Sequence, residues 1–236
     1  MSRGPLDPKP HKSLKDVNAG SRFDTIGRTI YAAENKVTAF MELLAPYRMT
    51  FENERTALKP LADAMNLEVA EYWEQILEEW GMDSSRTEFW LPNNFRKSRA
   101  IYELKFPLGW WIDLTATESI SALHTMFGSK WDTSKGRTSK VITRSDLESD
   151  DRVLTTSIAS EIRRWTTLDD GTRPLGVRFD SKHGAPAGES GACWAYWMRG
   201  KDAGFTERVE QVSENPIDAF DIDLLRAQRL SGLRMR

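Results

Sequence analysis

Three residues in the stretch SRFDTIGRTIYAAENKVTAFMELL, residues 21–44, have side chains suited to binding an anion and acting on a sugar. Arg22 stands beside an aromatic residue, Tyr31 lies in a short apolar run, and Glu42 lies on a stretch with helical periodicity. An arginine binds phosphates through paired hydrogen bonds, an aromatic ring stacks on planar groups, and a carboxylate stabilises developing positive charge. The same residues also fit exposed charges around a buried tyrosine. The choice between a binding site and an ordinary surface therefore depends on the rest of the chain.

A fourth candidate is Ser181, at the end of the apolar run GVRFD. Asp180 and Ser181 lead directly into the glycine-rich segment KHGAPAGESG, where backbone amides and a hydroxyl can face a ligand phosphate. The segment lacks the lysine pattern of a Walker loop. On these residues alone, an ordinary loop after a strand is the preferred interpretation.

Metal binding and disulfide formation are not expected. The three histidines and the one cysteine are scattered without ligand spacing, so we predict no metal site. His124 and His183 have no partner visible in the sequence that would make either a general base. Cys193 has no second cysteine with which to form an internal disulfide.

The segment TALKPLADAMNLEVAEYWEQILEEW, residues 56–80, has the size and apolar rhythm of a helix-turn-helix. Its second helix, however, carries glutamates and no lysine or arginine: Glu68, Glu71, Glu74, Glu78 and Glu79. Phosphates would repel this face. The whole chain has 33 basic and 35 acidic residues and a net charge of −2, so we expect no direct binding to nucleic acid and an acidic surface that is solvated or contacts a partner.

Composition places the chain among ordinary globular proteins, with 39% hydrophobic and 29% charged residues. The first twenty residues lack the apolar core of a signal peptide, and no run reaches the roughly 18 apolar residues that span a bilayer. We therefore expect a cytoplasmic protein without a membrane segment. At 236 residues, a single domain with an insertion is the default expectation.

A strand and a helix are predicted to position the first three candidates. Residues 28–33 read as a strand, and residues 34–45 as a helix that buries Val37, Phe40, Met41 and Leu44. Glu42 falls away from that stripe, beside small residues that leave room for a ligand. Residues 47–99 look like a helical insertion, whose clearest helix begins after Asn66, ends at Gly81 and buries a stripe that includes Trp73 and Trp80.

The second half mixes strands and helices without strict alternation. Strands are predicted at 100–106, 110–115, 174–181, 191–199 and 206–213, and helices at 116–127, 153–165 and 215–232. Thr115 and Asn215 are the expected helix caps, and Trp165 is expected in the core. Trp194 and Trp197 lie three residues apart on one strand, so they point to opposite faces and at least one is a candidate to line a cleft. The pattern predicts an α+β protein with a mixed sheet and flanking helices.

Three motifs in this order resemble the RES-domain family, the NAD-degrading toxins of bacterial toxin-antitoxin systems. They are SRFDTIGRTIYAAENKVTAFMELL, AIYELKFPLGWWIDLT and PLGVRFDSKHG, and the resemblance covers nearly the whole chain except the helical insertion at about 47–99. It implies one domain over residues 1–236 with an ADP-ribosyltransferase-like fold and a cleft for NAD. It also implies a cognate Xre-like antitoxin that blocks the cleft, and homo-oligomers are possible.

The resemblance further implies a role for each candidate residue. Arg22 would hold the pyrophosphate of NAD, Tyr31 would pack on nicotinamide or its ribose, Ser181 would bind NAD, and Glu42 would face the glycosidic bond as the catalytic carboxylate. NAD is then the substrate, without a metal, and its nicotinamide-ribose bond is cleaved by hydrolysis or phosphorolysis. Two alternatives remain open: transfer of ADP-ribose to a macromolecule, and a non-catalytic protein-interaction module.

Overall fold

A computed structural model describes residues 4–12, 20–47, 51–82, 90–91, 94–128, 141–149 and 151–235. The fold is α+β, with a mixed sheet and flanking helices, as predicted. The chain divides into two compact units. The first combines the residues up to Asn35 with Tyr102–Asn215, and the second combines Lys36–Ile101 with the residues from Pro216 onward.

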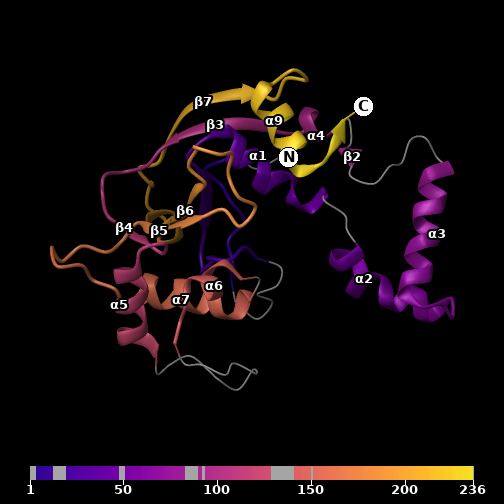
Figure 1. Cartoon of the computed structure of the whole chain (residues 1–236). Helices are drawn as coiled ribbons and strands as arrows, with labels where there is room; N and C mark the ends of the chain where they lie inside the picture. Colours follow the sequence, from indigo (N-terminus) through magenta and orange to yellow (C-terminus); the bar gives the residue numbers. More distant parts are fainter. Residues whose placement is uncertain are drawn as a thin grey trace. The chain divides into compact units, whose positions relative to one another are not determined.

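The first unit is built on a four-stranded sheet with the strand order β1-β6-β5-β4 (Figure 1). These strands are β1 (Thr29–Ala33), β4 (Trp111–Asp113), β5 (Gly176–Asp180) and β6 (Ala192–Trp197). β6 pairs antiparallel with both β1 and β5, whereas β4 is parallel to β5. Each strand lies within a range that the sequence predicts.

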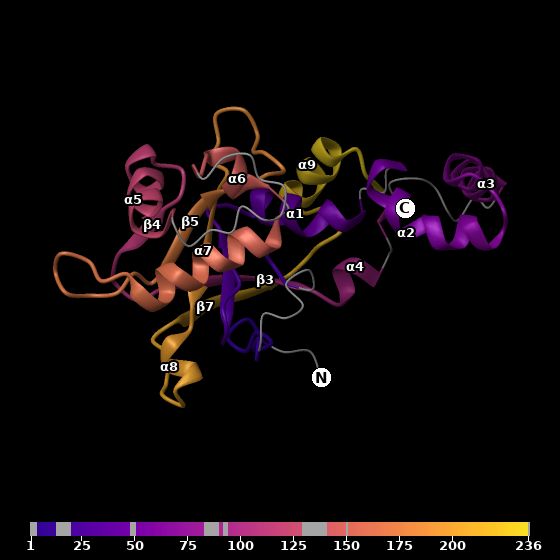
Figure 2. The ribbon, with the colours of Figure 1, turned by 90° about the horizontal axis from the view of Figure 1, so that it is seen from below.

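Three helices cover one face of this sheet: α5 (Thr117–Phe127), α6 (Arg144–Glu148) and α7 (Arg152–Trp165). Figure 2 shows α7 running across the strands. Ile158 and Ile162 of α7 pack with Val177, Ala195 and Trp197 of the sheet, and all five are buried. Burial of this apolar surface is the main force that holds the layers together.

The opposite face of the sheet carries a smaller cluster around Ile30 and Tyr196. Leu104 of β3 (Ala100–Lys105) and Phe106, which follows that strand, pack on this cluster. β3 also forms a two-stranded sheet with β7 (Glu210–Pro216). The short helix α8 (Arg199–Asp202) follows β6. Both faces of the sheet therefore contribute to the core of the first unit.

In the second unit, α1 (Lys36–Leu44) packs against α9 (Ile222–Ser231). The predicted stripe of α1 is buried, as are Leu91 of β2 (Trp90–Leu91) and Phe95 of α4 (Asn94–Lys97). β2 pairs in parallel with β8 (Arg234–Met235), and a 3-10 turn, Ala45–Tyr47, follows α1. Part of the predicted insertion thus belongs to this core.

Two longer helices of the predicted insertion, α2 (Phe51–Ala64) and α3 (Val69–Met82), pack against each other. Trp73 is buried, while the glutamates of α3 are exposed, as the charge pattern predicts. The side chain of Trp80 lies outside the described residues. The sequence predicts that this helix begins after Asn66, but α3 begins only at Val69. Asn66 has φ 55° and lies just after α2, because asparagine tolerates the left-handed conformation that closes a helix.

Other predicted helix boundaries are also wrong. Thr115 does not cap α5, because its amide and hydroxyl donate to Asp113 Oδ1, and Ala116 takes the cap position. Asn215 lies in β7, and α9 begins only after Asp221, whose carboxylate accepts from the amides of Asp223 and Leu224. Trp165, expected in the core, is exposed at the last residue of α7.

Among the described residues, none of the helices combines the length and apolar character that crossing a membrane requires.

Candidate functional site

Small residues on the central strand β6 allow large rings from its neighbours to meet. Tyr31 of β1 lies opposite Ala195, and Phe179 of β5 lies opposite Cys193, all on the helix-covered side. The rings of Tyr31 and Phe179 approach across β6 edge to face, with their centroids 6.4 Å apart. Phe23 joins them, with its ring 4.7 Å from that of Phe179. Tyr31, Phe179 and Phe23 thus form one aromatic cluster.

Arg22 lies against that cluster and is only 6% exposed. Its guanidinium carbon is 4.9 Å from the ring centre of Phe179 and 5.6 Å from that of Phe23, and Nη2 donates to the carbonyl of Asp180 at 3.4 Å. A cation over an aromatic face is attracted by the ring, and more strongly where water is excluded. Arg22 is therefore fixed beside the carboxyl end of β5.

The hydroxyl of Tyr31 accepts a hydrogen bond from the amide of Phe23 at 3.0 Å and donates to Asp24 Oδ1 at 3.1 Å. Burial of this hydroxyl, and next the negative charge of Asp24, raise the pKa of Tyr31 well above its ordinary value. The residue as a whole is 37% exposed, although its hydroxyl is enclosed. Tyr31 can thus offer an aromatic surface while its hydroxyl stays protonated.

Ser181 is buried at the start of the glycine-rich loop. Its amide donates to the carbonyl of Gly191 at 2.8 Å, and its Oγ accepts from the amide of His183 at 3.2 Å. Its carbonyl also accepts from the amide of Gly184, which has φ 82°. Ser181 therefore shapes the turn at the start of the glycine-rich segment.

The structure brings three of the four sequence-predicted site residues into one neighbourhood of the first unit. Arg22 contacts Phe179 and Asp180, Tyr31 contacts Phe179, and Ser181 follows them directly in the chain. Glu42 belongs to α1 in the second unit, where it is half-buried one helical turn after the buried Thr38.

Charged side chains form a connected chain at the same ends of β4 and β5. The sequence does not predict them as site residues. Arg178 bonds Asp113 at 2.9 Å and lies 3.8 Å from Asp180, and Asp180 pairs with Arg144 at 2.7 Å. Partial burial of Asp113 raises its carboxyl pKa, but the hydrogen bonds from Thr115 and the charge of Arg178 outweigh it, so the pKa lies below its ordinary value. Arg178 lies within the motif PLGVRFDSKHG, but its partner Asp113 depends on how β4 pairs with β5.

The two strand tryptophans point to opposite faces, as predicted. Trp197 is buried and donates from Nε1 to the carbonyl of Phe23 at 3.2 Å, so it supports the aromatic cluster. Trp194 is half-buried on the other face of the sheet, and its partner in the pairing of β5 with β6 is Arg178.

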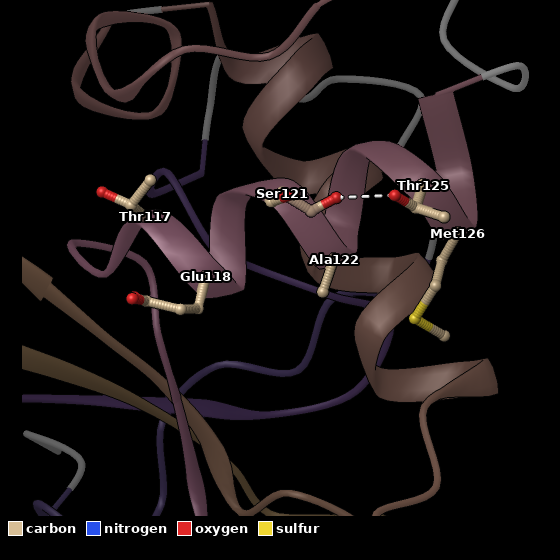
Figure 3. Close-up of a pocket in the computed structure, with 6 residues that line it drawn as sticks. All are labelled: Thr117, Glu118, Ser121, Ala122, Thr125 and Met126. Atoms are coloured by element: carbon tan, nitrogen blue, oxygen red, sulfur yellow. Dashed lines mark hydrogen bonds between the residues drawn. The ribbon is translucent and has the colours of Figure 1, made fainter.

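A surface hollow lies along α5, as Figure 3 shows. All six of its lining residues come from this one helix: Thr117, Glu118, Ser121, Ala122, Thr125 and Met126. Thr125 donates its hydroxyl back to the carbonyl of Ser121, a bond within the helix. The hollow is therefore a feature of one exposed helix face, and the candidate residues are not part of its lining.

Within the ranges that the structure describes, no group of three or more histidine, cysteine, aspartate or glutamate side chains is placed to hold a metal ion. Comparisons with family models, with curated proteins and with solved structures gave no match for this chain. The functional assignment therefore rests on the motifs and on the geometry above.

Proposed function

We propose that this protein is an enzyme that cleaves the nicotinamide-ribose bond of NAD, similar to the RES-domain toxins and their ADP-ribosyltransferase-like fold. The observation that carries the proposal is the meeting of Arg22 and Tyr31 at the ring of Phe179, two residues before Ser181 in the chain. Arg22, Tyr31 and Ser181 come from motifs separated by up to about 160 positions in the chain, and each has the side-chain type that the resemblance requires.

In this proposal the first unit binds the dinucleotide. The guanidinium of Arg22 holds the pyrophosphate, and its low exposure strengthens that attraction, because few water molecules screen it. The ring of Tyr31 packs on nicotinamide or its ribose. Ser181, which directly follows β5, binds NAD in this proposal, a role that rests on the resemblance.

The chemical step breaks the bond between ribose C1′ and the nicotinamide nitrogen. Its electron pair moves to the pyridinium nitrogen, which leaves as neutral nicotinamide, while C1′ acquires positive charge. The carboxylate of Glu42, a role that rests on the resemblance, stabilises this oxocarbenium-like transition state. Water then attacks C1′ and loses a proton to solvent, or inorganic phosphate attacks in its place.

Transfer of ADP-ribose to a macromolecule would break the same bond and differ only in the acceptor. A non-catalytic interaction module is the other candidate, and one observation favours it: the Tyr31 hydroxyl and the Arg22 guanidinium already bond to groups within the protein. In that case the aromatic cluster would serve the fold alone.

The test is release of free nicotinamide from NAD by the purified protein. Release in plain buffer supports hydrolysis, and release that needs inorganic phosphate supports phosphorolysis. Release only after addition of a protein or nucleic-acid acceptor, with label from the adenine ring retained on it, supports transfer instead. Absence of release in all three mixtures would overturn the enzyme proposal and favour the interaction module.

A cytoplasmic enzyme of this kind would consume the NAD of its own cell, so the proposal includes a neutralising partner, an Xre-like antitoxin. Expression of the protein alone should then lower cellular NAD and arrest growth. Expression together with the neighbouring gene product should restore both.

A further inference from the structure

The N-terminal segment Gly4–Lys12 is held against the strand-entry loop that carries Arg22 and leads into β1. His11 and Gly27 exchange two backbone hydrogen bonds, of 2.7 and 2.9 Å. Leu6 packs on the apolar cluster around Ile30, and Asp7 lies 3.6 Å from Arg28. The segment is thus attached at several points, and its last attachment places the imidazole of His11 beside the loop.

That imidazole meets Asp24, a carboxylate that is only 5% exposed. His11 Nε2 lies 3.1 Å from Asp24 Oδ2, which also accepts from the amide of Ser21 at 2.6 Å. The other oxygen, Oδ1, accepts from the hydroxyl of Tyr31 at 3.1 Å. A buried carboxylate is tolerated when both oxygens have donors, and here His11 supplies one of them.

The orientation of Asp24 decides where the Tyr31 hydroxyl points. Rotation about the last bond of an aspartate is soft, so hydrogen bonds fix the plane of the carboxylate. His11 and Ser21 hold Oδ2, and this holds Oδ1 toward Tyr31. The Tyr31 ring is in turn the surface that the proposed function gives to nicotinamide or its ribose.

We propose that His11 is a positioning residue for Tyr31 and acts through Asp24. The catalytic consequence rests on the proposed function, whereas the coupling of His11 to Tyr31 is a property of the folded protein itself. The charged groups that face Tyr31 in the described residues are Asp24 and Arg22, and His11 faces Asp24. Loss of the His11 contact therefore frees one oxygen of Asp24, and the change reaches Tyr31 through the other oxygen.

The experiment uses the full chain labelled with ¹³C at the Cζ of tyrosine, with the Tyr31 signal assigned by its loss in Tyr31→Phe. We expect this signal to shift in Asp24→Asn, which changes the group to which the Tyr31 hydroxyl donates. His11→Leu removes the donor to Asp24, and the signal should shift as well. His11→Gln keeps a neutral donor, so it should restore the signal to its wild-type position.

Activity gives the second measurement. We expect His11→Leu to lower kcat/KM for NAD by about tenfold and His11→Gln to recover most of the loss. Asp7→Asn is the matched control, because it loosens the same segment at Arg28 and leaves Asp24 untouched; both readouts should stay at the wild-type level.

An unchanged Tyr31 signal in His11→Leu would overturn the proposal, as would the same loss in Asp7→Asn. A wild-type protein that does not cleave NAD would overturn the proposed function instead, and the NMR comparison would still decide whether His11 positions Tyr31.

Discussion

Asp24 links two residues that are otherwise unrelated in sequence, because its two oxygens bind His11 and Tyr31 separately. At the scale of single residues, the candidate site is therefore a set of side chains that restrain one another. Arg22 shows the same property, since aromatic rings and a backbone carbonyl fix its guanidinium before any ligand binds. Such restraint is what a binding site needs if its groups are to lose little freedom when the ligand arrives.

The first prediction concerns Glu42. We expect Glu42→Gln to lower NAD turnover by about 10² to 10³, because a neutral amide stabilises an oxocarbenium-like transition state much less than a carboxylate does. The affinity for NAD should change little, since the contact acts mainly in the transition state. Steady-state release of nicotinamide measures the first, and calorimetric titration the second.

Glu74→Gln on the exposed face of α3 is the control for that substitution, because it makes the same chemical change on a solvated helix surface. If Glu42→Gln retains full turnover with unchanged thermal unfolding, Glu42 is an ordinary helix carboxylate and its catalytic assignment is wrong.

The second prediction follows from the raised pKa of Tyr31. An unfolded chain releases its tyrosine protons near pH 10, whereas folded Tyr31 keeps its proton to higher pH, because burial and Asp24 oppose the charged form. Above about pH 10 the unfolded state thus binds fewer protons, and the free energy of unfolding falls as pH rises.

Urea denaturation between pH 8 and 11 should show this fall in the wild type and a smaller one in Tyr31→Phe. Tyr102 and Tyr196 also have raised pKa values, but they are present in both proteins, so their effect cancels in the comparison. If the free energy of unfolding falls equally with pH in the two proteins, the Tyr31 hydroxyl is not enclosed as described.

The sequence identified the residue types of the site better than their partners. Arg22, Tyr31 and Ser181 could be named from their motifs, and the structure places Arg22 and Tyr31 against the same ring, that of Phe179. His11, Asp24 and the Asp113-Arg178 pair could not, because these contacts depend on how distant strands and loops meet. Residues 5–10 are rich in proline and have no helical or strand periodicity from which the contact made by His11 could be predicted.

At the scale of elements, Gly27 sets how the chain enters β1. It has φ 107°, and a Cβ there would lie 2.8 Å from Arg163 Nη1 and close to Asp202 Oδ2. Those side chains cannot simply move aside, because Arg163 pairs with Asp202 at 2.7 Å and also bonds Thr25 at 2.6 Å. The close approach therefore requires glycine.

We predict that Gly27→Ala lowers the free energy of unfolding by about 2 to 4 kcal/mol, from backbone strain together with overpacking. Gly171→Ala should lower it by only about 1 to 2 kcal/mol, because Gly171 also has positive φ but a Cβ there meets nothing within 4 Å. Urea denaturation of both variants gives the comparison. Equal losses would mean that the ion pair of Arg163 and Asp202 is not held against Gly27.

Strand and helix types were predictable where periodicity was strong, as in α1, α7 and β5, but helix starts were not. Thr115 and Asn215 are good capping residues by type, yet the first bonds Asp113 and the second belongs to β7. Side chains that can cap a helix can also serve a turn or a strand end, and tertiary contacts decide between these uses. Local sequence could therefore not settle these boundaries.

At the scale of the whole molecule, we predict that the hairpin of α2 and α3 serves association more than folding. The apolar core of the second unit is built from α1, β2, α4 and α9, while the acidic side chains of α3 face solvent. Replacing residues 51–82 with a short flexible linker should preserve a cooperative thermal transition. Sedimentation should then show a smaller oligomer, or weaker binding of a co-purified antitoxin.

A full-length variant with Glu71, Glu74 and Glu78 changed to lysine is the matched control, because it keeps the helices and reverses their surface charge. It should reproduce the change in association. Loss of the thermal transition on deletion would instead place the hairpin in the folding core.

Each unit is assembled from two separate stretches of chain, and the chain passes from one unit to the other after Asn35, Ile101 and Asn215. On the ribosome this arrangement sets an order of events. β1 leaves the exit tunnel roughly 160 residues before its partner β6, an interval of about 10 to 30 s at ordinary rates of synthesis. During that time the unpaired edge of β1 and the residues of the candidate site are kept apart from the strand that completes them, so newly made protein gains any activity only after β6 has emerged.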